Sequence, residues 1–308
     1  MESNPTRITH DFPPFFRVHS TGRIERYHQH DFVPPSHDPK TGVVSRDVVI
    51  SPENVPVRIY IPKTTQENQK LPLIVYIHGG AFSIESAFSS LYHNYVNILA
   101  SQSNSVVVSI EYRLAPEHPL PACYDDSYAA VKWIGSHSMA AGGPDPWISE
   151  HADFNRVYAA GDSAGANIAH HMVVRAGGGL GFRFSGLILV HPYFGMGKQE
   201  ELWNFICPDT TGGCDLRLNP TADLDLLSKL DCDRVLVCVA EKDVLRKRGL
   251  NYYEGLRRSG WKGLVELFES PGAEHVFHLF DPDSDSSVSL SERIGRFINH
   301  RSHGISHF

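Results

Sequence analysis

Short apolar runs alternate along the chain with longer segments in which hydrophobic residues recur every three or four positions. The runs are rich in Val, Ile and Leu, as strands buried on both faces of a parallel sheet are. They predict six central strands, at residues 73–79, 105–112, 155–162, 186–193, 234–243 and 264–270. The segments of helical period predict helices at residues 90–102, 123–137, 164–177 and 244–260. This alternation predicts an α/β fold with helices on both faces of the sheet.

Two more apolar runs precede the first central strand. Residues 47–51 and 55–62 are joined by a short turn-rich link, which predicts an antiparallel pair leading into the sheet. We therefore expect a mostly parallel, eight-stranded sheet in a single domain spanning residues 1–308. Two regions, 1–45 and 195–225, contain Gly, Pro and aromatic residues without a regular period. They are expected to be covering segments that form a cap over a site, and not sheet elements.

Composition and charge limit the partners and the cellular locations that the sequence allows. Lys and Arg number 28 against 35 Asp and Glu, for a formal charge of −7, and no basic run suits a phosphate backbone, so nucleic acid is excluded as a partner. The first thirty residues lack the apolar stretch of a secretory signal, and no later run is long enough to span a membrane. We expect a cytoplasmic protein.

The spacing of the cysteines and of the C-terminal histidines bears on whether the protein binds a metal. The five cysteines are scattered without CxxC spacing, which predicts free thiols in place of disulfides or a zinc site. His300, His303 and His307 are spaced like metal ligands but lie in a polar, frayed tail. We therefore expect neither a metal nor an organic cofactor.

One serine stands where a strand meets a helix. The sequence "GDSAG" at 161–165 fits the pattern G-x-S-x-G between an expected strand and an expected helix. In that setting the turn is strained, its glycines avoid collisions with neighbouring backbone, and the hydroxyl of Ser163 projects above the sheet. The helix N-terminus also directs free N–H groups at the negative charge that nucleophilic attack creates. By itself the motif also fits an ordinary strand-to-helix turn.

A serine hydroxyl is a weak nucleophile at neutral pH, so it needs a base and a group that orients the base. Asp243 ends the fifth central strand, and His275 lies in the loop after the sixth. This order, Ser then Asp then His, is the one expected for such a sheet. Asp243 could instead cap the helix that follows it. His278 is the nearest rival of His275, whereas His170 and His171 are interpreted as helix surface or packing residues.

The segment "IHGGAF" at 77–82 follows the first central strand and supplies backbone N–H groups. We expect the turn His78-Gly79-Gly80 to form an oxyanion hole from the amides of Gly79 and Gly80, together with the amide of Ala164. Glycine suits this turn because the main chain must approach the substrate closely.

These residues resemble the plant carboxylesterases of the hormone-sensitive-lipase group in the α/β-hydrolase superfamily. The resemblance covers almost the whole chain and rests on "HGGAF", "GDSAGAN", "GRIERY", "YRLAPEHPLPACYDD", "HPYF" and "SGWKGLVELFESPGAEHVFHLF". It implies an α/β-hydrolase fold with Ser163 as nucleophile, His275 as base and then acid, and Asp243 as its orienting group. Arg113 and Glu117 of "YRLAPE" are interpreted as loop supports, with substrate contact as the alternative.

Two departures from the family pattern concern the pocket. Ala81 replaces the third glycine that often follows the histidine, and the segment after "HPYF" is shorter than usual. Six aromatic residues are expected near the pocket, either lining it or in the core: Phe15, Phe16, Phe82, Tyr92, Trp203 and Phe277.

The sequence thus predicts a carboxylesterase that hydrolyses short-acyl esters of small apolar or specialised metabolites through an acyl-enzyme. Its partner is a small-molecule ester. Two alternatives stay open. A dehydratase or cyclase would use the same triad and oxyanion hole, and a hormone receptor similar to the gibberellin receptor would bind without catalysis. The presence of His275 argues against the receptor, because such receptors have lost the catalytic histidine.

Overall fold

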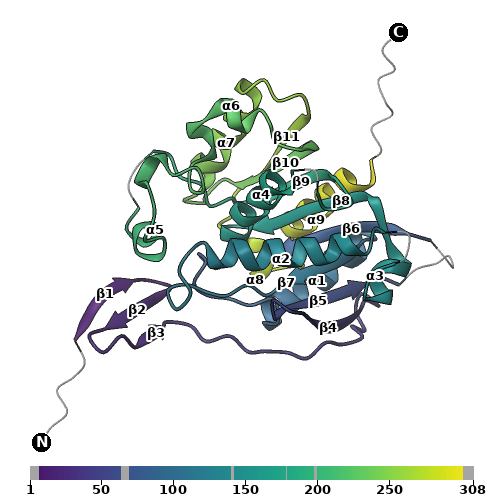
Figure 1. The fold of residues 1–308 in the computed structure, drawn as a ribbon, viewed down its shortest axis with the longest axis horizontal. Coiled ribbons are helices and arrows are strands. Elements are labelled where there is room, and N and C mark those ends of the chain that lie inside the picture. Colours follow the sequence, from purple (N-terminus) through teal and green to yellow (C-terminus); the bar gives the residue numbers. More distant parts are fainter. Residues whose placement is uncertain (1–6, 64–68, 140–141, 178, 198–199, 301–308) are drawn as a thin grey trace, which may run out of the picture.

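The computed structural model of the protein describes residues 7–63, 69–139, 142–177, 179–197 and 200–300. Its centre is a sheet of eight strands, drawn in Figure 1. The strands are β4 (Val44–Ile50), β5 (Val55–Ile61), β6 (Leu71–Ile77), β7 (Val106–Ile110), β8 (Ala152–Asp162), β9 (Phe184–Val190), β10 (Cys232–Ala240) and β11 (Leu264–Ser270). All eight strands expected from the apolar runs are therefore present, with ends shifted by a few residues.

The strands lie in the order β11-β10-β9-β8-β6-β7-β5-β4. The six strands from β11 to β7 run parallel, and β5 and β4 add antiparallel pairs at one edge. The predicted fold class, a mostly parallel eight-stranded sheet, is confirmed. Because β8 is central and its parallel neighbours end on the same side, groups that follow β6, β8 and β10 can meet at one edge of the sheet.

Helices cover both faces. On one face, α1 (Ser90–Ser103), α8 (Phe277–Phe280) and α9 (Asp285–Asn299) share a buried apolar cluster with Ile74 and Tyr76 of β6. On the other face, α2 (Ala122–Ser136), α3 (Pro146–His151), α4 (Ala164–Ala176) and α7 (Arg246–Arg258) share a second cluster with Leu73, Val75 and Ile77 of β6. The alternation along β6 puts apolar side chains on both faces, which is why the run reads as continuously hydrophobic. Within the described chain, no helix has the length and apolar character needed to cross a bilayer.

The helix α9 was not predicted from the sequence. Its segment is rich in serine, which disfavours a helix interior, but Leu290, Ile294, Phe297 and Ile298 form a buried stripe. Ser284 caps the helix by accepting a hydrogen bond from the amide of Ser287. Tertiary packing against α1 therefore outweighs the weak local propensity.

The N-terminal segment is a sheet, contrary to the expectation that it contains no sheet elements. It forms three antiparallel strands, β1 (Ile8–Phe12), β2 (Phe16–His19) and β3 (Ile24–Arg26), at one side of the molecule in Figure 1. Most residues of β1 are exposed, so its sequence lacks the alternating hydrophobic pattern of a half-buried strand. Ion pairs of Glu25 with Arg17 and Arg23 stabilise the small sheet instead.

The region 195–225 contains α5 (Glu201–Ile206), two short 3₁₀ turns, Gly212–Cys214 and Pro220–Ala222, and the start of α6 (Leu224–Leu227). Figure 1 shows α5 beside the small N-terminal sheet. Phe205 of α5 packs against Phe12 and Phe16, with ring centroids 5.0 and 6.1 Å apart. The two regions expected to form a cap are therefore in contact.

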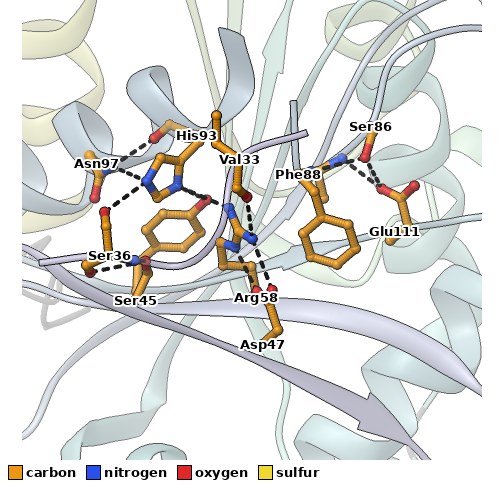
Figure 2. Close-up of polar contacts among 12 residues, drawn as sticks. Val33, Ser36, Ser45, Asp47, Arg58, Ser86, Phe88, His93, Asn97 and Glu111 are labelled. Atoms are coloured by element: carbon orange, nitrogen blue, oxygen red, sulfur yellow. Dashed lines mark hydrogen bonds and ion pairs between the residues drawn. The ribbon is translucent and has the colours of Figure 1, made fainter. Parts of the chain in front are cut away.

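A buried polar cluster fixes the connection between β3 and β4 to the main sheet (Figure 2). The guanidinium of Arg58, which is 1% exposed, makes two hydrogen bonds to Asp47 and donates a third, of 2.9 Å, to the carbonyl of Val33. His93 of α1 lies 3.0 Å from the hydroxyl of Ser36. Burial and the charge of Arg58 lower the pKa of His93 to about 4, so the ring is neutral.

Candidate active site

Ser163 occupies the sharp turn between β8 and α4. Its φ of 52° and ψ of −119° lie in a region that side chains rarely adopt, as the strained turn predicts. Its amide donates to the carbonyl of Val190 on the neighbouring strand, and its carbonyl accepts from the amide of Tyr193. These bonds to the next strand hold the strained residue at the edge of the sheet.

The two glycines of the motif are required by the approach of helix to sheet. A Cβ on Gly165 would lie 2.1 Å from the carbonyl oxygen of Ile77, and one on Gly161 would lie 2.5 Å from the backbone of Gly165. Both positions are fixed backbone, so no side chain could move aside. The predicted reason for the glycines, collision with neighbouring backbone, is therefore correct.

The structure brings Ser163, His275 and Asp243 together in one chain of hydrogen bonds. Nε2 of His275 lies 3.0 Å from Oγ of Ser163, and Nδ1 lies 2.9 Å from Oδ2 of Asp243. A carboxylate oxygen can only accept here, so Nδ1 carries the proton and Nε2 is free to accept the proton of the serine. The Asp243 side chain is fully buried, whereas the imidazole is 31% exposed and open to substrate.

Asp243 bonds to His275, and Leu245 takes the cap position of α7 that was the alternative role for Asp243. Oδ1 accepts a 2.7 Å hydrogen bond from the amide of Leu245 at the start of α7, while Oδ2 accepts from His275. Burial raises the pKa of Asp243, but the hydrogen bond and charge of His275 outweigh it and hold the pKa below its ordinary value. The carboxylate is therefore ionised at neutral pH.

The rival histidines lie elsewhere. His278 is buried against Tyr95, with ring centroids 4.6 Å apart, and neither of its nitrogens has a partner within the described chain. Nδ1 of His170 lies 3.0 Å from the hydroxyl of Tyr252, and His171 donates to the carbonyl of Arg217. All three are packing residues.

The oxyanion prediction needs one correction. The amide of Gly79 donates a 2.8 Å hydrogen bond to the hydroxyl of Tyr92, so it has no proton left for a substrate. Gly80 and Ala81 line the cavity beside the serine, with φ of 98° and 51°. Within the described part of the chain, the amides of Gly80, Ala81 and Ala164 have no acceptor. These three amides are the available donors.

His78 supports this turn from inside the protein. Its ring stacks on Tyr112 at 4.2 Å, and Nδ1 donates to the carbonyl of Gly79 at 2.9 Å. Burial lowers the pKa of His78 to about 4, so the ring is neutral at pH 7. His78 is absent from the cavity lining in the described chain and braces the turn without facing substrate.

A cavity of about 640 Å³ opens beside Ser163. Part of the lining is polar, with His28, Gln29, His30 and Asp31 from the segment after β3 and with Glu85, whose carboxylate lies 3.3 Å from Nδ1 of His30. The remaining lining is mostly apolar: Pro14, Phe15, Ile84, Leu91, Leu245, Val276 and Leu279. Val244 and Phe280, which are 87% and 71% exposed, lie at its open side.

The expected cap divides into two parts with different roles. Residues 14–15 and 28–31 of the N-terminal region line the cavity, but no described residue of 195–225 does. Of the six aromatics expected near the pocket, Phe15 and Tyr92 line it, Phe277 packs on His191, and Phe16, Phe82 and Trp203 are core. Tyr193 also lines the cavity but was not predicted from the sequence. Its hydroxyl donates to Glu200 of the second region.

Arg113 and Glu117 are supports, as interpreted from the sequence. Arg113 forms a two-pronged ion pair with Asp126 of α2, and Glu117 pairs with Arg26 of β3. Neither is among the described lining residues of the cavity.

The possible metal ligands that lie close together belong mostly to the triad. Among the described residues, the one group with ligand atoms close enough to share an ion is His191, Asp243 and His275, and two of these already bond each other. His300 is not part of it, and His303 and His307 lie outside the described residues. All five cysteines are free, as predicted.

Comparisons with known proteins agree with this geometry. Residues 74–279 match the family described as having an alpha/beta hydrolase fold. The chain is 46% identical to the 2-hydroxyisoflavanone dehydratase of Glycyrrhiza echinata over 94% of this chain and 96% of that protein. It is 42% identical to Probable carboxylesterase 1 of Arabidopsis thaliana, over 95% and 98%. A thermophilic carboxylesterase cloned from a metagenomic library superposes with a TM-score of 0.67 at 25% identity, over 88% of this chain and 90% of that chain.

Proposed function

This chain belongs to the hormone-sensitive-lipase group of α/β hydrolases, with plant carboxylesterases and 2-hydroxyisoflavanone dehydratases as relatives, and we propose that it is a serine carboxylesterase whose nucleophile is Ser163. The observation that carries the proposal is the unbroken hydrogen-bond chain from Ser163 through His275 to Asp243 beside an open cavity. A protein that only stores or binds a ligand needs no such chain.

In the proposed reaction, Oγ of Ser163 attacks the ester carbonyl while Nε2 of His275 takes its proton. The amides of Gly80, Ala81 and Ala164 donate to the oxyanion of the tetrahedral intermediate. His275 then returns the proton to the departing alcohol, leaving an acyl-serine. Water, deprotonated by the same imidazole, attacks the acyl group and releases the carboxylic acid. Asp243 holds the imidazole in the reactive tautomer throughout.

The cavity supports a small ester with an apolar body as substrate. A volume of about 640 Å³ accommodates a drug-sized molecule, and most of the lining is aliphatic or aromatic. Ala81 narrows the space next to the oxyanion donors, which favours a short acyl chain with the bulk of the molecule in the alcohol. The polar part of the lining gives the alcohol part hydrogen-bonding partners at one end.

We also propose a cytoplasmic location. Five free cysteines, four of them buried, suit a reducing compartment. Fractionation of expressing cells, followed by immunoblotting against cytosolic and organellar markers, tests this.

A dehydratase is the second candidate, because a 2-hydroxyisoflavanone dehydratase is among the relatives at 46% identity. In that reaction His275 would remove a proton from the carbon next to a ketone, the oxyanion amides would stabilise the enolate, and hydroxide would leave from the neighbouring carbon with a proton as water. Ser163 would take no covalent part. A receptor is the weaker alternative, because such receptors have lost the catalytic histidine, whereas His275 is present here and lies 3.0 Å from Ser163.

The test compares wild type, Ser163→Ala and His275→Gln on chromogenic acetate and butyrate esters, with circular dichroism to verify folding. An esterase loses a thousandfold or more in both variants, on the order expected for losing a member of such a triad. For the dehydratase, a hydroxylated flavanone is supplied and loss of water is followed by mass spectrometry. Water loss that survives Ser163→Ala but not His275→Gln favours elimination, whereas binding without turnover favours the receptor.

A further inference from the structure

A buried carboxylate lies directly behind the nucleophile. Asp162 is 1% exposed, and its two oxygens accept hydrogen bonds from two tyrosine hydroxyls: Tyr76 at 2.6 Å on Oδ1 and Tyr92 at 2.8 Å on Oδ2. Both rings are also buried. Burial raises the pKa of each hydroxyl well above its ordinary value, so both stay protonated and donate.

The two tyrosines differ in one respect. The hydroxyl of Tyr92 also accepts a 2.8 Å hydrogen bond from the amide of Gly79, whereas among the described residues the Tyr76 hydroxyl bonds to Asp162 alone. A chain therefore runs from Gly79 N–H to the Tyr92 oxygen and from the Tyr92 proton to Asp162. Burial raises the pKa of Asp162 to about 6 despite these hydrogen bonds, so the group is mostly ionised above pH 7. Its charge polarises the Tyr92 hydroxyl and makes the oxygen a better acceptor for Gly79.

This series of hydrogen bonds holds the start of a strained backbone turn. Gly80, Ala81 and Phe82 follow Gly79 with φ of 98°, 51° and 61°, three successive residues in a region that only glycine adopts readily. The Cα of Gly79 also lies close to the carboxylate, because a Cβ at this position would be 2.5 Å from Oδ2 of Asp162. The amide of Gly79 is thus the fixed point from which the strained turn starts.

We propose that Tyr92 is a positioning residue for the oxyanion hole: backed by Asp162, its hydroxyl holds the amide of Gly79 and thereby sets the direction of the Gly80 and Ala81 amides. This inference rests on the proposed esterase function. Oxyanion donors must be placed within about 0.5 Å to be effective, and losing one outright costs about 10²–10³ in kcat. Loosening the turn without removing a donor is expected to cost about 10- to 100-fold.

Tyr92→Phe is the test and Tyr76→Phe is its matched control. Each substitution keeps a buried ring and removes one hydroxyl from the same carboxylate, but only Tyr92→Phe leaves the amide of Gly79 without an acceptor. If the tyrosines serve only to stabilise Asp162 and the fold, the two variants behave alike. If Tyr92 positions the turn, kcat separates them.

The measurements are kcat and KM on a chromogenic butyrate, the inhibition constant of an aryl trifluoromethyl ketone that forms a tetrahedral adduct with the serine, and the thermal midpoint. We expect Tyr92→Phe to lower kcat about 10- to 100-fold and to leave KM within about twofold. The inhibition constant of the ketone should rise by a factor similar to the loss in kcat. Tyr76→Phe should keep kcat within about threefold, although its thermal midpoint falls too.

Equal kcat in the two variants, or wild-type kcat in Tyr92→Phe, overturns the positioning role while the esterase stands. A wild type that turns over no ester overturns both proposals. Should Tyr92→Phe fail to fold, Asp162→Asn replaces it, since it leaves the Tyr92 hydroxyl but removes the charge behind it. Its expected effect is a loss of about 3- to 10-fold in kcat with KM unchanged, and an unchanged kcat contradicts the role of Asp162.

Discussion

Arg26 and Glu117, 91 residues apart in the chain, are joined by two parallel hydrogen bonds of 2.7 Å. Arg26 belongs to the small N-terminal sheet and Glu117 to the main body. The same guanidinium donates from Nε to the carbonyl of Ser83, just past the oxyanion turn. Arg26 therefore ties the segment that lines the cavity to the main body through Glu117, and to the segment of the oxyanion donors through Ser83.

Glu117→Gln removes the ion pair but leaves the bond from Arg26 to Ser83. A two-pronged, partly exposed pair contributes about 1 kcal/mol. Loosening the polar part of the lining should therefore raise KM about fivefold and leave kcat within twofold, measured by steady-state kinetics on a bulky aryl ester. Arg17→Ala is the control, because its partner Glu25 lies within the same small sheet. A KM that is equally raised in Arg17→Ala would contradict this role for Glu117.

Asp243→Asn should lower kcat about 10³- to 10⁴-fold with a wild-type circular dichroism spectrum. An asparagine that keeps its oxygen on the amide of Leu245 presents NH₂ to Nδ1 of His275, which then has to accept. The proton moves to Nε2, and the imidazole can no longer take a proton from Ser163. Asp231→Asn is the control, because Asp231 is an exposed partner of Arg183. Activity of Asp243→Asn within tenfold of wild type would exclude the proposed orienting role.

Gly165→Ala should destabilise the fold by about 3 kcal/mol or more, because the added Cβ would lie 2.1 Å from one carbonyl oxygen and 2.4 Å from the next. The expected fall in the thermal midpoint is about 5–10 °C. Gly179→Ala is the control, since a Cβ there meets nothing within 4 Å. Equal midpoints for the two variants would show that the helix can move away from the sheet at little cost.

Stability should fall steeply as the pH drops from about 6.5 to 4. Burial is the largest cause lowering the pKa of seven histidines: His78, His93, His137, His170, His171, His191 and His278. Between these pH values the histidines of the unfolded chain bind protons, whereas the buried rings of the native protein stay neutral. Each histidine with a folded pKa of about 4 therefore lowers the free energy of unfolding by up to about 3 kcal/mol.

Two carboxyls act in the opposite direction. Burial raises the pKa of Asp162 to about 6 and of Glu111 to about 7, so the native protein binds their protons first and gains stability as the pH falls. Seven histidines outweigh them. Urea midpoints at pH 7.5, 6 and 5 should therefore decline, and His278→Leu should flatten the decline because it removes a buried ring without hydrogen bonds. Midpoints that stay level from pH 7.5 to 5 would refute this.

The chemistry at the carboxyl ends of the strands was readable from the sequence because strand ends are local features. Asp243 and His275 each follow an apolar run, and parallel strands bring such positions to one edge whatever the loops do. The partner of Gly79 was not readable. It depends on a side chain of α1 that reaches across the sheet edge, and nothing near Tyr92 in the sequence marks the direction of its hydroxyl.

The N-terminal sheet escaped prediction for a different reason. Its first strand buries little, and the sheet is held by ion pairs and by aromatic contacts with α5, so the period that identifies a buried strand is missing there. A sequence pattern reports contacts with the core. It does not report contacts between two peripheral segments.

The contact between that sheet and α5 orders the events of biosynthesis. Phe12 leaves the ribosome about 190 residues before Phe205, against which it packs. At roughly 5–20 residues per second, the first strands therefore wait on the order of 10–40 s for their partner. During that time Phe12 and Phe16 lack the ring of Phe205, which packs against both in the folded protein.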